Sequence, residues 1–290
     1  MSRAALAGVL AALVLAAGLG GAGGAQAATS GVPHLRHVVV LVLENKEYGD
    51  VIGSPEAPNL NRLAASGALL TNYDAVAHPS LPNYLALVSG STQGITSDCT
   101  SCVVHARNLA DTLDAAGLTW RTYAEGLPYP GFTGSAAGRY AKKHDPLMYF
   151  ADVSGRADRR VRVVPLTRLS ADLRRGGLPR FSLVVPDLCH DMHDCPVTTG
   201  DTWIGRFLPP LLATRAMRDG AVFVVFDEGT GDAGGGGHIP ALVLGPRVRP
   251  GARDGAPLTH YSLLRTVDDA LGLPALGASA GAEPIVGIWR

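Results

Sequence analysis

Three short runs of apolar residues constrain what this chain can fold into more than any other feature of its sequence. Residues 37–43 (HVVVLVL), 181–185 (FSLVV) and 221–226 (AVFVVF) are rich in β-branched and aromatic side chains. A strand with one face in water alternates apolar and polar residues, whereas continuous runs of this kind are typical of strands buried on both faces. The sequence therefore predicts an α/β domain in which helices cover both faces of a mostly parallel sheet.

The segments between these runs supply the remaining predicted elements. Apolar residues at helical spacing, together with capping residues and glycine stops, mark the helices. We expect helices over residues 58–67, 107–116, 202–217 and 260–271, and further strands over residues 68–77, 118–124 and 239–244. Asn59 is the expected cap of the first helix, and Pro209 and Pro210 are expected to break the third.

The first 27 residues read as an export signal. Arg3 supplies a positive start, residues 4–18 are rich in Ala, Leu and Val, and residues 25–27 (AQA) match a cleavage site. A retained membrane anchor is the alternative, but the apolar stretch is short and is followed by a glycine-rich segment. We therefore expect a secreted protein without stable membrane insertion, with residues 28–290 forming a single domain.

The four cysteines form two local pairs, spaced C-x2-C and C-x5-C. In an exported protein disulfides are the default state of cysteine. We expect Cys99 to pair with Cys102 and Cys189 with Cys195, each bond holding the shape of a loop. A four-cysteine zinc site is the alternative, which the unequal spacings and the compartment disfavour.

The overall charge argues against some classes of partner. The 25 Lys and Arg residues balance the 25 Asp and Glu residues, so the formal net charge is zero. Such a balance gives no electrostatic reason to expect nucleic acid or an anionic membrane as partner. We expect no nucleic-acid partner, and the composition gives no oligomeric state.

Polar side chains follow four of the predicted strands, at the point where each strand ends. They are Glu44 and Asn45 after residues 37–43, Ser80 after residues 68–77, the segment 187–194 (DLCHDMHD) after residues 181–185, and Asp227 and Glu228 after residues 221–226. The carboxyl ends of parallel strands lie at one edge of a sheet, so these residues are expected to converge. Carboxylates, an amide and imidazoles around a serine form a hard-ligand site for a divalent cation. Solvated turns at single strand ends are the alternative.

The stretch 78–90 (HPSLPNYLALVSG) presents Ser80 at the start of a predicted helix. Free N–H groups and the helix dipole favour an anion there, which suits a serine that attacks phosphate. A simple helix cap is the alternative for Ser80. Lys142 and Lys143, beside His144, are in position to contact an anion or to form a solvated face.

Several segments resemble a known family in matching order. They are ENKEYGDVIG (44–53), HPSLPNYLALVSG (78–90), KKHDPLMYF (142–150), VVPDLCHDMHD (184–194), FVVFDEG (223–229) and HYSLLRTVDDALGLP (260–274). They resemble bacterial phosphoesterases, which include secreted acid phosphatases and phospholipase C-type enzymes of the alkaline phosphatase superfamily. The resemblance implies an alkaline phosphatase-like three-layer fold with a mostly parallel central sheet flanked by helices, and a phosphoesterase catalytic domain over residues 28–290.

The resemblance also implies roles for the matching residues. A divalent metal ion, of unknown identity, would be held by Glu44, Asn45, Ser80, Asp227 and Glu228. Ser80 would be the nucleophile, with His193 and His144 as further catalytic residues. Substrate binding would fall to Asn83, His144, Asp194 and His260. Asp145 stands where many relatives carry asparagine, and Glu228 stands where two-zinc members carry histidine, which implies one metal ion.

The expected activity is hydrolysis of phosphate monoesters, among them phosphoinositides, through a phosphoserine intermediate. The substrate would be a small-molecule or lipid phosphate ester. A phosphodiesterase of phospholipase C type, acting on phospholipid head groups, is the first alternative. An exported binding protein that has lost catalysis is the second, against which the intact serine and acidic ligands argue.

Overall fold

Eight strands form the central sheet, in the order β11-β2-β10-β9-β1-β8-β4-β7. The computed structural model describes Met1 and residues 31–290, so the predicted export signal lies outside the described residues. The strands are β1 (His37–Leu43), β2 (Ala68–Leu70), β4 (Trp120–Ala124), β7 (Val163–Pro165), β8 (Phe181–Val185), β9 (Gly220–Phe226), β10 (Ala241–Leu244) and β11 (Ala252–Asp254). β10 is antiparallel to β2 and β9, and the other neighbouring pairs are parallel.

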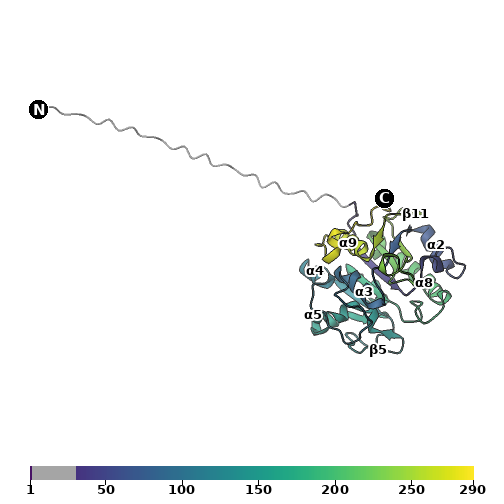
Figure 1. Cartoon of the computed structure of the whole chain (residues 1–290), viewed down its shortest axis with the longest axis horizontal. Helices are drawn as coiled ribbons and strands as arrows, with labels where there is room; N and C mark the ends of the chain where they lie inside the picture. Colours follow the sequence, from purple (N-terminus) through teal and green to yellow (C-terminus); the bar gives the residue numbers. More distant parts are fainter. Residues whose placement is uncertain (2–30) are drawn as a thin grey trace.

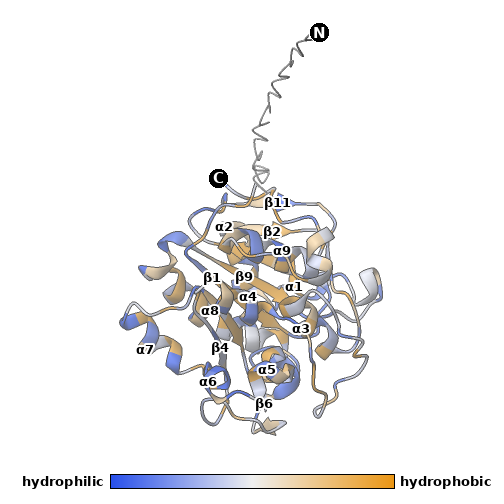
Figure 2. Cartoon of the chain, turned by 90° about the vertical axis from the view of Figure 1, so that its left-hand side faces the viewer, coloured by the Kyte–Doolittle hydropathy of each residue, from blue (hydrophilic) through white to orange (hydrophobic). Residues whose placement is uncertain are grey.

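The centre of the sheet is its most apolar part. Every residue of β1, β8 and β9 is buried, and Figure 2 shows β1 and β9 crossing the middle of the molecule. β1 lies between β8 and β9, so the two strongest apolar runs of the sequence are direct neighbours. The predicted mostly parallel sheet, flanked by helices, is confirmed.

Helices cover both faces of this sheet. In Figure 1, α2 (Pro58–Ser66) and α8 (Val197–Leu212) lie on one side and contact each other. On the other side lie α3 (Ser80–Ser89), which contacts α9 (His260–Leu271) and α4 (Leu109–Ala115), together with α5 (Ala151–Ser154). The shorter helices are α1 (Tyr48–Val51), α6 (Ala157–Arg160) and α7 (Arg168–Arg174). Small two-stranded sheets join β3 (Tyr73–Asp74) to β12 (Leu258–Thr259) and β5 (Ala136–Ala137) to β6 (Tyr140–Ala141).

Two predicted elements differ in extent. The strand expected over residues 68–77 is split into β2 and β3, because β3 pairs with β12 outside the main sheet. The helix expected over residues 202–217 is α8, which begins at Val197 and continues through Pro209 and Pro210. These prolines lie in its last turn, where the buried side chains of Leu208 and Leu211 hold the helix against the core.

The predicted cap of α2 is wrong. The helix begins at Pro58 with Ala57 as its N-cap, and Asn59 lies within its first turn. The carboxylate of Asp201 on α8 takes the capping role from outside. Its oxygens accept the backbone N–H groups of Asn59 at 3.1 Å and Leu60 at 2.8 Å.

Both predicted disulfides are present. Cys99 is bonded to Cys102 and Cys189 to Cys195, with Cα atoms 5.7 and 4.7 Å apart. All four sulfurs are thereby used, which rules out the four-cysteine zinc site. Over residues 31–290, none of the helices has the combined length and apolar character needed to cross a bilayer.

Candidate active site

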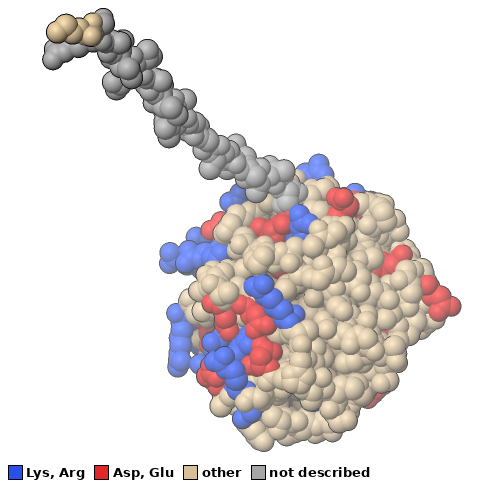
Figure 3. All heavy atoms as spheres, turned by 60° about the vertical axis from the view of Figure 1, so that its left-hand side comes forward, with Lys and Arg blue, Asp and Glu red and all other residues tan. Residues whose placement is uncertain are grey.

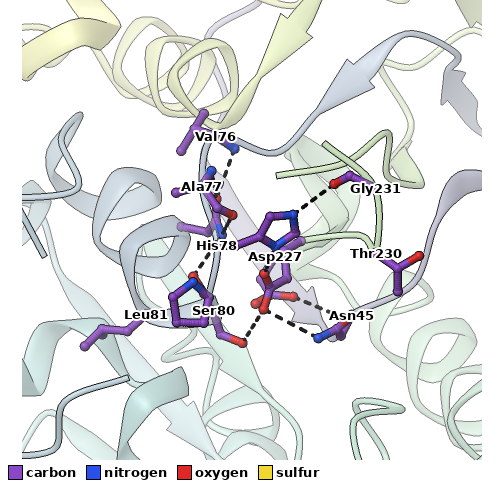
Figure 4. A network of polar contacts seen from close by, with 12 residues as sticks. Asn45, Val76, Ala77, His78, Ser80, Leu81, Asp227, Thr230 and Gly231 are labelled. Carbon is purple, nitrogen blue, oxygen red and sulfur yellow. Dashed lines mark hydrogen bonds and ion pairs between the residues drawn. The ribbon is translucent and has the colours of Figure 1, made fainter. Parts of the chain in front are cut away.

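Polar side chains from two neighbouring strands and one helix meet at the carboxyl edge of the sheet. Glu44 directly follows β1, and Asp227 and Glu228 directly follow β9. Ser80 reaches the site from the start of α3, and Figure 4 shows its side chain directed toward Asp227 and Asn45. Its Oγ lies 2.9 Å from Glu228 Oε1 and 3.1 Å from Glu44 Oε2. All four residues are buried.

Ser80 is the first residue of α3, but its hydroxyl does not cap the helix. The N-cap is Pro79, whose side chain makes no capping hydrogen bond. The Ser80 hydroxyl is directed to the two carboxylates instead, so the interpretation of Ser80 as a simple cap is wrong. The next backbone N–H, that of Leu81, donates to Asp98 Oδ1 at 3.0 Å.

Asn83 holds the segment that leads into Ser80. Its Oδ1 accepts the N–H groups of Val76 and Ala77 at 3.0 and 3.1 Å, and its Nδ2 donates to Ala77 O at 2.7 Å. Both polar atoms of this buried amide are thus engaged by backbone. Its predicted contact with phosphate stays a prediction that requires one of these bonds to open.

The carboxylates have opposite pKa shifts because their neighbours differ. Burial disfavours the charged form of Glu44, but His144 and the Tyr84 hydroxyl outweigh it and lower the pKa of Glu44 to about 2. Burial raises the pKa of Asp227 well above its usual range, and the charges of Glu44 and Glu228 add to this shift. Asp227 Oδ2 is a buried oxygen without a hydrogen-bond partner. A cation at this point would satisfy that oxygen and relieve the repulsion.

His78, to which the sequence analysis gave no role, contacts Glu228. Its Nδ1 pairs with Glu228 Oε2, and its Nε2 donates to Gly231 O at 2.9 Å. Burial alone would lower the pKa of His78, but the contacts with Gly231 O and Glu228 raise it. His78 thereby fixes one oxygen of Glu228 and leaves the other facing Ser80. The sequence offered one signal for this role, namely that His78 lies two residues before Ser80.

The glycine-rich loop after β9 packs closely on the chain before Ser80. A Cβ on Gly236 would lie 2.5 Å from Ala77 O, so only glycine fits there. On the other side of the loop, Glu47 Oε1 accepts the N–H groups of Thr230 and Gly231 at 2.9 and 2.6 Å. The loop therefore connects the segment before Ser80 to Glu47 on the opposite side of the site.

His144 lies beneath the site between two carboxylates. Its Nε2 is 3.0 Å from Glu44 Oε1, its Nδ1 is 3.2 Å from Asp191 Oδ2, and its ring stacks on Tyr84. Burial opposes a charged imidazole, but the two carboxylates outweigh it and raise the pKa of His144 to about 9. His144 is therefore a buried cation at neutral pH that compensates the charge of Glu44.

Lys143 and His193 form a pair at the more exposed side of the site. Lys143 Nζ lies 3.2 Å from His193 Nε2 and 3.0 Å from Asp98 Oδ2. Because an ammonium group only donates, His193 Nε2 accepts and its Nδ1–H donates to Asp194 Oδ1 at 2.7 Å. Burial would lower the pKa of Lys143, but Asp98 and Glu44 raise it. Lys143 thus belongs to the site, and Asp98 was missed by sequence reasoning.

His260 does not face the position of a substrate. It is buried under the strand end, where its Nε2 donates to the backbone carbonyl of Asp227 at 2.6 Å and its Nδ1 faces Tyr73 Oη at 3.3 Å. Burial lowers the pKa of His260 to about 4, so the ring is neutral. Its predicted contact with substrate does not fit this position, and it supports Asp227 from below.

The side chains of the ligand-rich segment 187–194 belong to two separate clusters, of which only one is at the site. Asp191 and His193 reach the site through His144 and Lys143. Asp187 and His190 turn instead toward Glu125, whose Oε2 lies 2.9 Å from His190 Nδ1. Sequence proximity alone gave no means of separating the two sets.

The carboxylate donor set fits one divalent cation. One carboxylate oxygen from each of Glu44, Asp227 and Glu228 lies within 4.8 Å of the others. Asp227 also carries the buried oxygen Oδ2, which has no hydrogen-bond partner. Asn45, in the left-handed region with φ 48°, places its amide 3.5 Å from Glu228. Glu44, His144 and His193 form a second group of this size. In this second group, His144 Nε2 faces Glu44 Oε1 directly, at 3.0 Å.

Residues 54–274 match the family described as Phosphoesterase. The chain belongs to the Phosphoesterase family. This phosphoesterase is 37% identical to the phosphatidylinositol-3-phosphatase of Mycobacterium tuberculosis, over 97% of this chain and 92% of the relative. It is 35% identical to the phosphate-repressible acid phosphatase of Penicillium chrysogenum, over 76% of this chain and 55% of that protein. The phosphoesterase is accordingly a hydrolase of phosphoric esters.

Solved structures confirm the fold of the phosphoesterase. A Vibrio parahaemolyticus protein of the alkaline phosphatase superfamily matches 88% of this chain and 71% of its own, with a TM-score of 0.62 and 16% identity. The periplasmic domain of EptC from Escherichia coli matches with a TM-score of 0.53 and 11% identity, over 84% of each chain. The expected alkaline phosphatase-like architecture is thus confirmed.

Proposed function

We propose that this phosphoesterase is a secreted, metal-dependent phosphatase that hydrolyses phosphate monoesters through a phosphoserine at Ser80. The carrying observation is the Ser80 hydroxyl, placed at the N-terminus of α3 and within 3.1 Å of two buried carboxylates. A helix N-terminus favours an anion and the carboxylates favour a cation, so the site suits both a phosphate ester and a divalent metal ion. The names of the relatives support monoester hydrolysis.

The chain's own residues supply each proton transfer in the proposed reaction. Ser80 Oγ forms a bond to phosphorus as the bond from phosphorus to the leaving oxygen breaks. The hydroxyl proton passes to Glu228 Oε1, whose raised pKa suits a base. The proton held between Lys143 Nζ and His193 Nε2 passes to the leaving oxygen. Water then attacks phosphorus as the bond from phosphorus to Ser80 Oγ breaks. One proton of the water passes to the Lys143–His193 pair, which restores it, and Glu228 returns its proton to Ser80 Oγ.

The proposed cation would be held by the predicted set of ligands, and its identity is open. They are Glu44, Asn45, Ser80, Asp227 and Glu228. A bound divalent ion would lower the pKa of the serine hydroxyl and neutralise charge that develops on the phosphoryl group. His144, already cationic, adds a fixed positive charge beneath Glu44.

Secretion and the class of partner are also part of the proposal. The two disulfides are compatible with an oxidising compartment. On the face seen in Figure 3, acidic and basic side chains are interleaved rather than gathered into one broad basic patch. We propose a small or lipid phosphate ester as substrate, with phosphatidylinositol 3-phosphate included because a relative is named for it.

The test compares p-nitrophenyl phosphate with its bis ester, using wild-type protein and Ser80→Ala. Loss of about 10³-fold or more in turnover of the monoester by the variant is expected if a covalent step is removed. Preference of the wild type for the bis ester would favour a phospholipase C-type diesterase instead. Wild-type rates in Ser80→Ala would overturn the assignment of the nucleophile.

A further inference from the structure

A carboxylate of the chain itself lies where a substrate phosphate is expected. Asp98 Oδ1 accepts the backbone N–H of Leu81 at 3.0 Å, and Asp98 Oδ2 accepts Lys143 Nζ at 3.0 Å. Leu81 directly follows Ser80 on the first turn of α3. Lys143 also lies 3.2 Å from His193 Nε2. Both oxygens of Asp98 are therefore held by groups that border the nucleophile.

These donors are the ones that a phosphoryl group on Ser80 needs. A group bonded to Ser80 Oγ at a helix N-terminus places its oxygens beside the next backbone N–H. Lys143 is the cation on the more exposed side of the site, with its side chain 20% exposed. Ser80 itself is only 1% exposed. An ester therefore cannot reach the hydroxyl in this arrangement unless a neighbouring group moves.

Asp98 is the group best placed to move. It lies in the irregular segment between α3 and α4, and its side chain is 28% exposed. The backbone near it is anchored, because Cys99 is bonded to Cys102 and Lys142 Nζ donates to Thr100 O at 3.1 Å. Rotation of the side chain alone releases Leu81 N–H and Lys143, while the loop keeps its place.

We propose that Asp98 is an intramolecular mimic of the substrate phosphate, which closes the site and is displaced when substrate binds. The proposal rests on the proposed function of Ser80. Two anions sharing the same donors repel each other in a partly buried site, so the carboxylate and the phosphate exclude one another. The apparent affinity for phosphate is the intrinsic affinity multiplied by the fraction of molecules in which Asp98 is displaced.

This competition makes Asp98 a residue that determines specificity. To bind, a ligand must replace the singly charged Asp98 carboxylate as the acceptor of the hydrogen bonds from Leu81 N–H and Lys143. A dianionic phosphate monoester forms stronger charge-assisted hydrogen bonds than a monoanionic diester, so it displaces Asp98 more readily. Asp98 therefore favours monoesters over diesters of similar size.

The test uses Asp98→Asn, which keeps the size of the side chain and an oxygen acceptor for Leu81. Binding of inorganic phosphate to the metal-loaded proteins is measured by calorimetry, and KM is measured for p-nitrophenyl phosphate and its bis ester. We expect phosphate to bind about tenfold more tightly to the variant, because a charged competitor is removed. The ratio of kcat/KM for monoester over diester falls. Asp158→Asn, which removes an exposed carboxylate paired with Arg156, is the matched control and leaves both values unchanged.

Unchanged or weaker phosphate binding in Asp98→Asn would overturn the proposal and make Asp98 a positioning residue for Lys143. Thermal melting checks the fold of the variant, and Asp98→Ser repeats the measurement if the asparagine variant unfolds. Calorimetry requires no turnover, so it decides the role of Asp98 even when neither ester is hydrolysed. Failure of the proposed function appears separately, as loss of ester hydrolysis in the wild type.

Discussion

Three buried carboxylates meet at the site, two of them on the Ser80 hydroxyl, and a different neighbour orients each of the three. The neighbours are Tyr84 for Glu44, Asn45 for Asp227 and His78 for Glu228. Such outer contacts orient metal ligands before the ion binds and lower the cost of binding. At the scale of single residues, the carboxylates are thus oriented for a cation by Tyr84, by His78 and by the backbone N–H of Asn45.

The first prediction concerns His78. His78→Ala is expected to weaken the affinity for the activating divalent ion about 10- to 100-fold, because Glu228 loses the partner that orients it. Metal titration of phosphatase activity measures the effect, and excess metal should restore turnover. His105→Ala, at an exposed histidine, is the control. An unchanged metal requirement in His78→Ala would contradict this role.

Single residues were predictable from the sequence where a strand fixes their direction. Glu44, Asp227 and Glu228 directly follow buried strands, so the sheet alone places them at one edge. Asn83 and His260 lie on helices, where the side that faces the site depends on packing that the sequence does not show. Lys143 lies on a single 3-10 turn over residues 142–144 and Asp98 lies on an irregular segment, and no periodicity defines the path of either.

Contacts between helices stabilise the two flanking layers at the scale of elements. The N-terminus of α2 is closed by Asp201 on α8, which accepts two backbone N–H groups and the Asn59 amide. This cap comes from a residue far along the chain, so capping rules, which consider only neighbours in sequence, pointed to Asn59 instead.

Asp201→Ala is therefore expected to destabilise the fold by about 2 kcal/mol, since it leaves the N–H groups of Leu60 and Asn59 without their acceptor. Denaturant unfolding measures the loss, and Asp201→Asn should lose less because it keeps one oxygen. Glu283→Ala, at an exposed position, is the control. Equal stability of Asp201→Ala and wild type would refute the capping role.

A buried acid on α9 predicts how stability depends on pH. Burial raises the pKa of Asp268 to about 8, against about 4 in the unfolded chain. The folded chain therefore binds one more proton between these values, so its stability falls as pH rises from about 4 to about 8. Asp268→Asn should remove a slope of about 1.4 kcal/mol per pH unit near pH 6. Denaturation of both proteins at pH 5 and pH 7 tests this, and parallel pH profiles would contradict it.

At the scale of the whole molecule, one sheet carries the site and joins its two helical layers. β1 and β9 lie at the centre of the sheet and supply three of the carboxylates, while α3 on one face supplies the serine. The continuous apolar runs were enough to predict this centre. The strand over residues 239–244 was predicted, but its antiparallel direction as β10 was not, and neither were the edge strands β7 and β11, because their pairing depends on loops.

Binding of a cation at the sheet edge should stabilise the entire domain. An ion at about 100 times its Kd contributes about 2.7 kcal/mol, which corresponds to an increase in Tm of roughly 5–10 °C for a domain of this size. Asp227→Asn should lose this increase. Asp187→Asn, in the separate group with Glu125 and His190, should keep it. If Asp187→Asn loses the increase in Tm instead, the ion binds at Glu125, Asp187 and His190, and this prediction is contradicted.

The central claim is that phosphoryl transfer passes through Ser80. Rapid acid quenching of the metal-loaded protein during turnover of a phosphate monoester, followed by mass spectrometry of its peptides, tests this most directly. We predict one phosphoryl group on the peptide that contains Ser80, and none in Ser80→Ala. Steady turnover without phosphate on this peptide, together with full activity of Ser80→Ala, would contradict the account.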